Sequence, residues 1–212
     1  MQLKQKLALQ INGGVHVMKY IKAALFVLLA GFTLLTSASE WLIDNDHSQL
    51  NFISTKKVNI AEVHQFTELR GGLDASGQFS VNINLASVDT HISIRDSRMA
   101  EFLFEIESYA TATLSANIDL DTLDAISLGA NSRMSVAATL ELHGESKALE
   151  LDVIITRLIG GQLSVVSAQP VILNTADFSL VAGVDKLREI AKLPSISQAV
   201  PVSFYLILNL KR

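Results

Sequence analysis

The chain of 212 residues contains no cysteine. Disulfide bonds, thiol redox chemistry, covalent haem attachment and cysteine-based zinc sites are therefore excluded, and stability must come from packing and hydrogen bonding. Histidine is also scarce, and no two histidines beyond residue 39 have the i, i+2 or i, i+4 spacing that places both on one metal ion. The sequence predicts no metal site and no cofactor from these residues, which are His47, His64, His91 and His143.

Motifs of nucleophilic catalysis and of nucleotide binding are missing as well. His47-Ser48 stands close to acidic residues, but neighbouring strand residues point to opposite faces and no Gly-x-Ser-x-Gly elbow exists. We interpret this dipeptide as part of the turn of the first strand. Gly71-Gly72 and Gly160-Gly161 lack the Lys-Ser/Thr of a phosphate loop and are interpreted as turns. The sequence therefore predicts a protein that is not an enzyme.

One segment has the order of a secretory signal peptide. A cationic start at residues 18–22 precedes an apolar run from Ala23 to Leu35, and the small residues 36–39 follow. The run is short for a bilayer span, so we expect cleavage rather than an uncleaved anchor. We predict that residues 1–39 are an N-terminal extension with a signal peptide whose true start is Met18, and that residues 40–212 form one exported domain. This domain is predicted to be periplasmic or secreted, without stable membrane insertion.

The exported part lacks a basic surface. Loss of residues 1–39 reduces the 17 lysines and arginines to 13 and leaves all 21 acidic residues, a net charge of −8. Such a chain would be repelled by phosphate backbones, and no stripe of Lys and Arg with interleaved aromatics reverses this. Nucleic acid is therefore excluded as an expected partner.

The domain is rich in residues that alternate with period two, which predicts antiparallel strands with one apolar face. Glycine-containing segments between them predict hairpin turns. Helical spacing occurs only in residues 96–107 and 185–193, where Asp96 and Asp185 are candidate N-caps. We predict an all-β fold with minor helices, an antiparallel eight-stranded barrel with two short helices. The strongest alternations are Leu50/Phe52/Ser54, Val81/Ile83/Leu85, Leu114/Ala116/Ile118/Leu120, Val136/Ala138/Leu140/Leu142, Leu149/Leu151/Val153/Ile155 and Phe204/Leu206/Leu208/Leu210.

Three stretches are similar to the YceI-like family of exported lipocalin-like barrels. They are the opening segment Trp41–Phe52, the Arg-Asp segment Ser93–Phe104, and the Leu-x-Leu-x-Gly hairpin within Ala138–Leu151. The segment Asn174–Ser179 departs from the family pattern. The resemblance implies a barrel that binds a polyisoprenoid or another long-chain lipid in its interior.

Bulky apolar side chains are the candidate ligand-binding groups, because they supply a wall for a long apolar chain and outnumber any acid/base machinery. Arg95 is a possible head-group contact, although we favour a structural role beside Asp96, in which it pins the helix over the barrel mouth. The candidates for the cavity wall are Phe52, Phe66, Phe79, Met99, Phe102, Phe104, Met134, Phe178 and Phe204.

We therefore predict an exported carrier that sequesters a polyisoprenoid or fatty-acid-like chain. Two alternatives remain open at this point. The first is an enzyme for a lipid-like substrate, with His47, His91, Arg95 and Asp96 meeting at the barrel mouth. The second is a protein-interaction or stress-response module with a filled core. A homodimer is possible, but no contiguous apolar stripe requires one.

Overall fold

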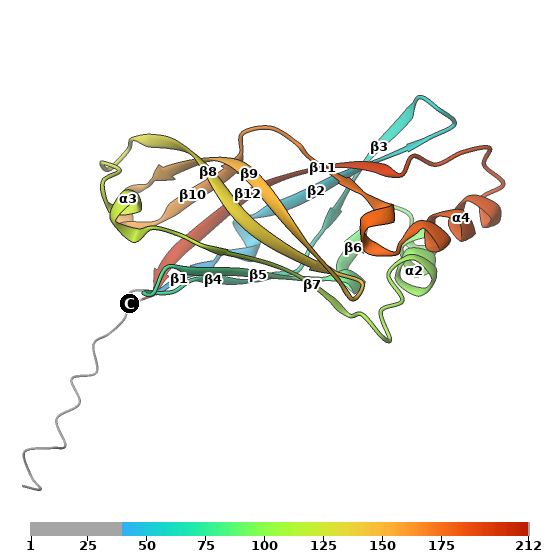
Figure 1. The fold of residues 1–212 in the computed structure, drawn as a ribbon, viewed down its shortest axis with the longest axis horizontal. Coiled ribbons are helices and arrows are strands. Elements are labelled where there is room, and N and C mark those ends of the chain that lie inside the picture. Colours follow the sequence, from blue (N-terminus) through green and yellow to red (C-terminus); the bar gives the residue numbers. More distant parts are fainter. Residues whose placement is uncertain (1–39, 212) are drawn as a thin grey trace, which may run out of the picture. The chain divides into compact units, whose positions relative to one another are not determined.

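The computed structural model describes residues 40–211, so the predicted signal peptide lies outside the described part of the chain. Eight strands form a closed antiparallel ring in the order β1-β4-β5-β7-β8-β9-β10-β12, and β12 returns to pair with β1 (Figure 1). This confirms the predicted eight-stranded barrel. The ring strands are β1 (Glu40–Ile43), β4 (Leu69–Leu73), β5 (Gln78–Asn84), β7 (Thr111–Asn117), β8 (Asn131–Leu142), β9 (Glu145–Arg157), β10 (Leu163–Ser167) and β12 (Ala199–Lys211).

Four further strands extend the wall at one end of the ring. β12 makes this possible because it is long: its second half pairs with β10 and β1, while its first half pairs with β11 and β2. β2 pairs in turn with β3, and β3 pairs with β6. The extension strands are β2 (Gln49–Lys56), β3 (Ile60–Phe66), β6 (Val88–Asp89) and β11 (Val171–Asn174).

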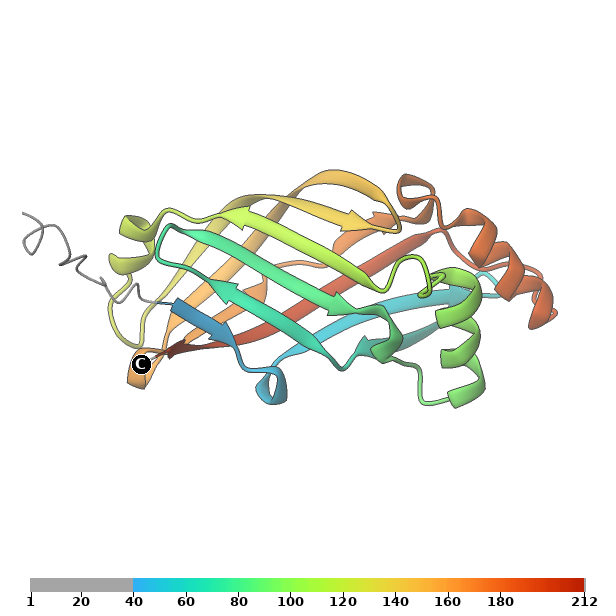
Figure 2. The same ribbon diagram turned by 90° about the horizontal axis from the view of Figure 1, so that it is seen from below.

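Helices lie at both ends of the barrel (Figure 2). The extended end carries α2 (Ser93–Arg98), which continues into a π-helical turn over Met99–Leu103, and α4 (Val181–Ile190). α3 (Leu120–Asp124), which the sequence analysis did not predict, lies at the opposite end. No helix within residues 40–211 is long and apolar enough to cross a membrane.

Both predicted helices exist, but their predicted N-caps are wrong. The N-cap residues are Ile92 and Leu180, and neither caps with its side chain. Asp96 lies inside the first turn of α2, where its Oδ1 accepts a hydrogen bond from the Thr90 backbone N–H at 2.9 Å. Asp185 lies within α4, where it accepts from Arg188. Asp96 therefore binds the segment just before α2 without acting as its N-cap.

The interpretation of Gly71-Gly72 as a turn is also wrong, because both glycines lie inside β4. A Cβ on Gly71 would lie 2.1 Å from the Ser80 carbonyl oxygen of β5, and one on Gly72 would lie 1.9 Å from the Trp41 carbonyl oxygen of β1. Glycine is required at this position because a side chain would separate the strands that close the ring. By contrast, residues 74–77 and 143–144 do connect adjacent strands as hairpins.

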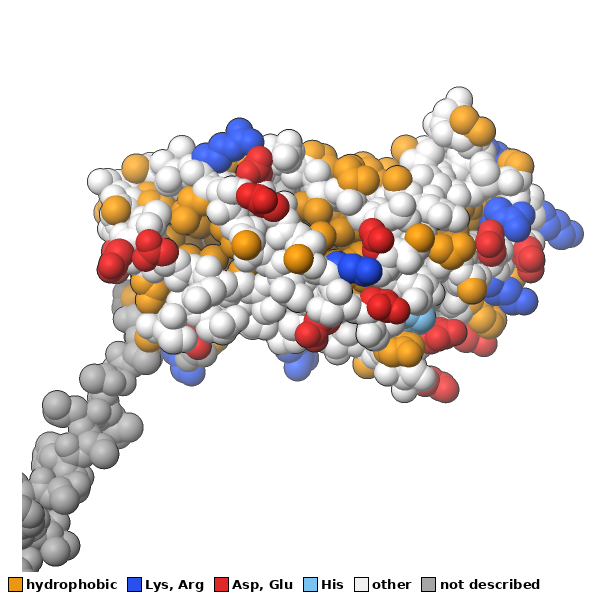
Figure 3. Space-filling model, in the orientation of Figure 1, with side chains coloured by type: hydrophobic (Ala, Val, Ile, Leu, Met, Phe, Trp, Pro, Cys, Tyr) orange, Lys and Arg blue, Asp and Glu red, His pale blue; other side chains and the backbone are white. Residues whose placement is uncertain are grey.

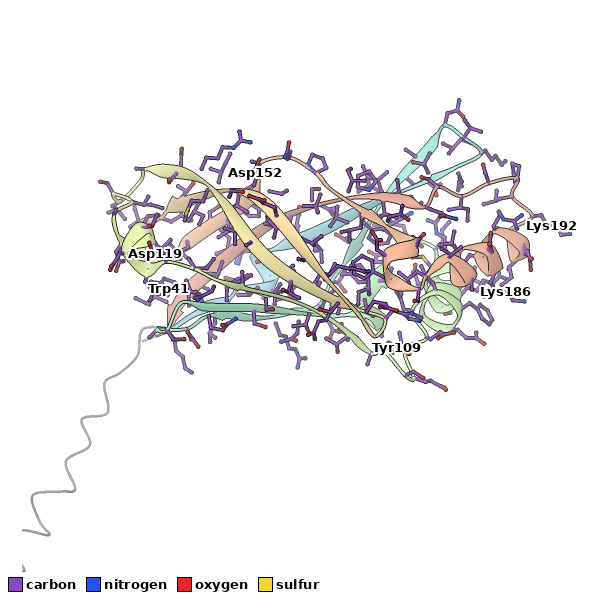
Figure 4. All side chains as sticks on the ribbon, viewed as in Figure 1. Trp41, Tyr109, Asp119, Asp152, Lys186 and Lys192 are labelled. Carbon is purple, nitrogen blue, oxygen red and sulfur yellow. The ribbon has the colours of Figure 1, made fainter. Side chains whose placement is uncertain are left out.

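Strand alternation divides the side chains between a core and a surface. The apolar inward residues form the main core, which includes Leu85 and Leu208, each 1 % exposed. On the face visible in Figure 3, acidic and basic side chains are interspersed with scattered hydrophobic ones. Trp41 lies near the α3 end of the barrel, whereas Lys186 of α4 and Lys192, just after α4, lie at the other end (Figure 4). The Trp41 Nε1–H donates to the Gly161 carbonyl at 3.0 Å. This bond ties β1 to the β9–β10 turn.

Candidate functional site

The barrel encloses a cavity of about 590 Å³. Its walls come from every strand of the ring except β1, from the extension strands β2, β3 and β11, and from α2, α3 and α4. This volume lies within the range of about 300–1,000 Å³ that small-molecule pockets occupy. The wall is overwhelmingly apolar along the ring, where Leu, Val, Ile and Phe side chains point inward from alternate strand positions.

Seven of the nine predicted wall residues line this cavity. Phe52, Phe66 and Phe104 form a chain of ring contacts with centroids 5.3 and 5.7 Å apart. Their contact with a ligand stays a prediction. The residues that line the cavity are Phe52, Phe66, Phe79, Met99, Phe104, Phe178 and Phe204.

The other two predicted residues, Phe102 and Met134, do not line the cavity. Met134 is half-buried and packs against the main core from β8. Phe102 is displaced by the π-helical turn, in which the Phe104 N–H donates to the Met99 carbonyl five residues back. Because a π turn shifts the facing positions by one residue, Leu103 and Phe104 face the cavity with Met99 instead.

One end of the cavity is polar. The inward faces of β2 and β3 line it, and their side chains change in character along the strands. Leu50 and Phe52 of β2 lie toward the ring, whereas Ser54 and Lys56 lie toward the hairpin tip. On β3 the same progression runs from Phe66 through His64 to Glu62, with Ser54 paired opposite Glu62. The cavity therefore has an apolar length and a polar end beside α2.

An ion cluster occupies the polar end. Glu62 Oε2 accepts from Lys56 Nζ at 2.8 Å and from Arg95 Nη1 at 2.7 Å. The hydrogen bond from Lys56, followed by that from Arg95, lowers the pKa of Glu62 below its usual value. Arg95 also donates from Nε to Thr90 Oγ1 and from Nη2 to the Thr90 carbonyl, and Thr90 bonds Asp96. Arg95 therefore fixes α2 to β3, which is the structural role that the sequence analysis weighed for it.

Three groups at this end have unused hydrogen-bonding capacity. His64 is 3 % exposed; its Nε2 lies 2.8 Å from Ser54 Oγ, and its Nδ1 has no partner within residues 40–211. Thr175 is 7 % exposed, and its Oγ1 likewise has no partner in the described chain. Arg98, one turn after Arg95 on α2, lines the cavity half-buried and forms no ion pair with any described residue. Burial, followed by the charge of Arg95, lowers the pKa of His64.

The residues of the alternative enzyme site do not meet. His47 lies in the turn after β1 and pairs with Asp44 at 3.0 Å, while His91 pairs with Asp89 at 3.4 Å. Both histidines are largely exposed, and neither bonds Arg95 or Asp96. Within residues 40–211 no three His, Asp or Glu side chains form a group that could hold a metal ion.

A closed barrel with an apolar interior, capped beside an Arg-Asp segment, agrees with the sequence resemblance. The family model for the YceI-like domain matches residues 41–208. The chain belongs to the YceI-like family.

Solved structures similar to this YceI-like chain include a polyisoprenoid-binding domain from Saccharophagus degradans implicated in plant cell wall breakdown. It is 36 % identical, with a TM-score of 0.79, and the match covers 81 % of this chain and 98 % of that domain. BcnA of Burkholderia cenocepacia (16 % identity, TM-score 0.59, covering 78 % of this chain and 98 % of that one) shares the fold. So does the YceI protein of Campylobacter jejuni (17 % identity, TM-score 0.52, covering 70 % and 84 %). No curated protein matches the chain.

Sequence reasoning missed the polar end. His64, Lys56, Glu62 and Arg98 were not singled out as site residues, although all four line the cavity. The available signal was the period-two pattern of Leu50, Phe52 and Ser54, which continues through polar residues on the same face. A polar residue that replaces an apolar one on the inward face of a strand requires a partner, and that need marks a candidate site.

Proposed function

We propose that this protein sequesters or carries one long apolar chain, polyisoprenoid or fatty-acid-like, inside its barrel. The observation that carries the proposal is the apolar cavity of about 590 Å³ within a closed ring. The polyisoprenoid-binding domain from Saccharophagus degradans, at 36 % identity over nearly its whole length, supports this class of ligand.

The energetics favour a long ligand. Each methylene group transferred from water into the cavity contributes about 0.8 kcal/mol to the binding free energy. Ten carbons therefore contribute roughly 8 kcal/mol before the cost of association is subtracted. Association costs about 4–15 kcal/mol in translational, rotational and conformational freedom. A short chain therefore gains little, whereas a chain that follows the length of the barrel gains a net affinity without any catalytic group.

The cavity disfavours the alternative of an interaction module with a filled core, because the interior is not packed solid by its own side chains. The enzyme alternative lacks its proposed constellation, since His47 and His91 pair with neighbouring aspartates and neither bonds Arg95. We further propose that the barrel works outside the cytoplasm, after removal of the leader that the apolar run of residues 23–35 indicates.

Mass spectrometry tests the function directly. The mature protein is purified from the exported fraction of cells that produce the whole chain, and its native and denaturing mass spectra are compared. We expect a stoichiometric adduct in the native spectrum that organic solvent extracts as a long-chain lipid. A native mass equal to the polypeptide mass, unchanged after incubation with polyprenyl and fatty-acyl compounds, would contradict the proposal.

A further inference from the structure

The inward face of the β2–β3 hairpin gives the cavity a direction. Side chains change from apolar at Leu50 and Phe66 to polar at Ser54 and His64, then to charged at Lys56 and Glu62. The opposite end, where Leu123 of α3 and Leu208 of β12 line the cavity, has no polar group in its described wall. A molecule with one apolar tail and one polar head is complementary to this cavity only with its tail toward α3.

The charges at the polar end are unequal. Three cationic side chains line it, namely Lys56, Arg95 and Arg98, against one carboxylate, Glu62. Lys56 and Arg95 share a single oxygen of that carboxylate. Asp96 adds a second negative charge behind the wall, where Thr90 engages it. The side chains that line the cavity at this end therefore carry a net positive charge, although the domain as a whole is acidic.

The excess positive charge lies on Arg98. Arg95 is largely committed, because three of its five N–H groups, one each on Nε, Nη1 and Nη2, donate to Thr90 or Glu62. Arg98 has no such partner and is half-buried against the cavity. A guanidinium that is partly removed from water gains most from an anionic oxygen acceptor, which it can bind through two parallel N–H groups.

His64 is a second, independent indication of a bound polar group. A buried ring nitrogen without a partner costs free energy, which a ligand atom at Nδ1 recovers. An anionic oxygen selects the tautomer with hydrogen on Nδ1, and in this tautomer the Ser54 hydroxyl donates to Nε2 across 2.8 Å. Both groups therefore favour an acceptor-rich head.

We propose that the ligand carries an anionic oxygen head group, carboxylate or phosphate, which Arg98 holds at the α2 end of the cavity with His64 as a further donor, while the tail extends toward α3. This inference rests on the proposed lipid-carrier function and adds to it the class and the direction of the ligand. It also assigns to Arg98 the role that the sequence suggested for Arg95.

Ligands that share one tail test the head-group preference. The delipidated mature protein is titrated with geranylgeraniol, geranylgeranoic acid and geranylgeranyl monophosphate, and binding is measured by isothermal titration calorimetry. We expect the wild type to prefer at least one of the two anions over the alcohol by about 10- to 100-fold, the range for hydrogen bonds to charged groups. The stronger of the two anions identifies the head as carboxylate or phosphate.

Three variants separate charge from structure. Arg98→Gln should abolish the preference for the anion while leaving the affinity for the alcohol unchanged, and Arg98→Lys should restore part of it. Arg133→Gln is the matched control, because Arg133 lies on the outer face of β8 in an exposed pair with Asp152 and should retain the full preference.

Failure of the inference is distinguishable from failure of the function. Equal affinities of the wild type for the alcohol and both anions would overturn the head-group proposal and leave the lipid carrier standing. An anion preference that survives in Arg98→Gln would overturn the assignment to Arg98. Absence of binding for all three ligands would contradict the proposed function itself.

Discussion

Ala116 offers a way to fill the cavity without disturbing the polar end. It lies on β7, is 7 % exposed, and lines the cavity between its strand neighbours Phe79 and Ala138. Ala116→Phe adds a six-carbon aromatic ring to this side chain. The ring would fill part of the cavity in which we expect the ligand to bind. The substitution is therefore expected to act on binding and on stability in opposite directions.

The magnitudes follow from apolar burial. A ring that occupies the space of about six methylene groups removes about 5 kcal/mol of gross ligand transfer energy, which corresponds to a loss of affinity on the order of a thousandfold. In the ligand-free protein the same ring is buried, which contributes about 2 kcal/mol. For a domain of this size that contribution raises the melting temperature by about 4–8 °C.

Calorimetric melting of delipidated protein and titration with a long-chain ligand measure the two effects. Ala137→Phe is the control, because Ala137 is the neighbouring exposed position on β8 and its ring would face solvent. We expect the control to leave ligand affinity unchanged. Wild-type affinity in Ala116→Phe, together with a raised melting temperature, would refute the conclusion that the ligand occupies this cavity.

Gly72→Ala should destabilise the fold by about 3 kcal/mol or more in urea unfolding, since the Cβ would lie 1.9 Å from a β1 carbonyl, whereas Gly129→Ala, with nothing within 4 Å, should cost about 1–2 kcal/mol for its positive φ alone. Burial, reinforced by a nearby guanidinium, lowers the pKa of His64 from 6.5, so the unfolded chain takes up the proton first as pH falls. The stability that His64 contributes is thus complete above about pH 6.5 and is lost as pH falls through the folded-state pKa. Urea titrations across this range should show a smaller pH dependence in His64→Gln than in the wild type. Trp41→Phe should lower the free energy of unfolding by about 1 kcal/mol through loss of its indole hydrogen bond, and an unchanged midpoint would contradict that role.

Much of the barrel was predictable because alternation is a local signal. β8, β9 and β12 run over 12 to 13 residues each, and their alternation marks both the strand and its buried face. The apolar wall followed from the same signal, since bulky residues on an inward face must line whatever the barrel encloses. Seven of the predicted side chains line the cavity for this reason.

The remaining features depend on contacts between distant parts of the chain. Gly71-Gly72 has the local chemistry of a turn, and only the close approach of β1 and β5 explains why glycine lies within a strand. The π-helical turn that redirects Phe102 leaves no signature in residue spacing. Arg98 is distinguished from Arg95 only by the structure, which shows that Arg95 pairs with Glu62 and donates to Thr90.

The closure of the ring by its first and last strands constrains how the protein folds. The Asn209 side chain donates to Asp44 across 165 residues of sequence, and Leu208 pairs with Ile43 in the same region. Because β12 follows every other strand of the ring in the sequence and pairs with four strands, the ring cannot close before β12 has been synthesised. Contacts of such high sequence separation also slow folding. The inward face of the ring consequently stays open until β12 is in place.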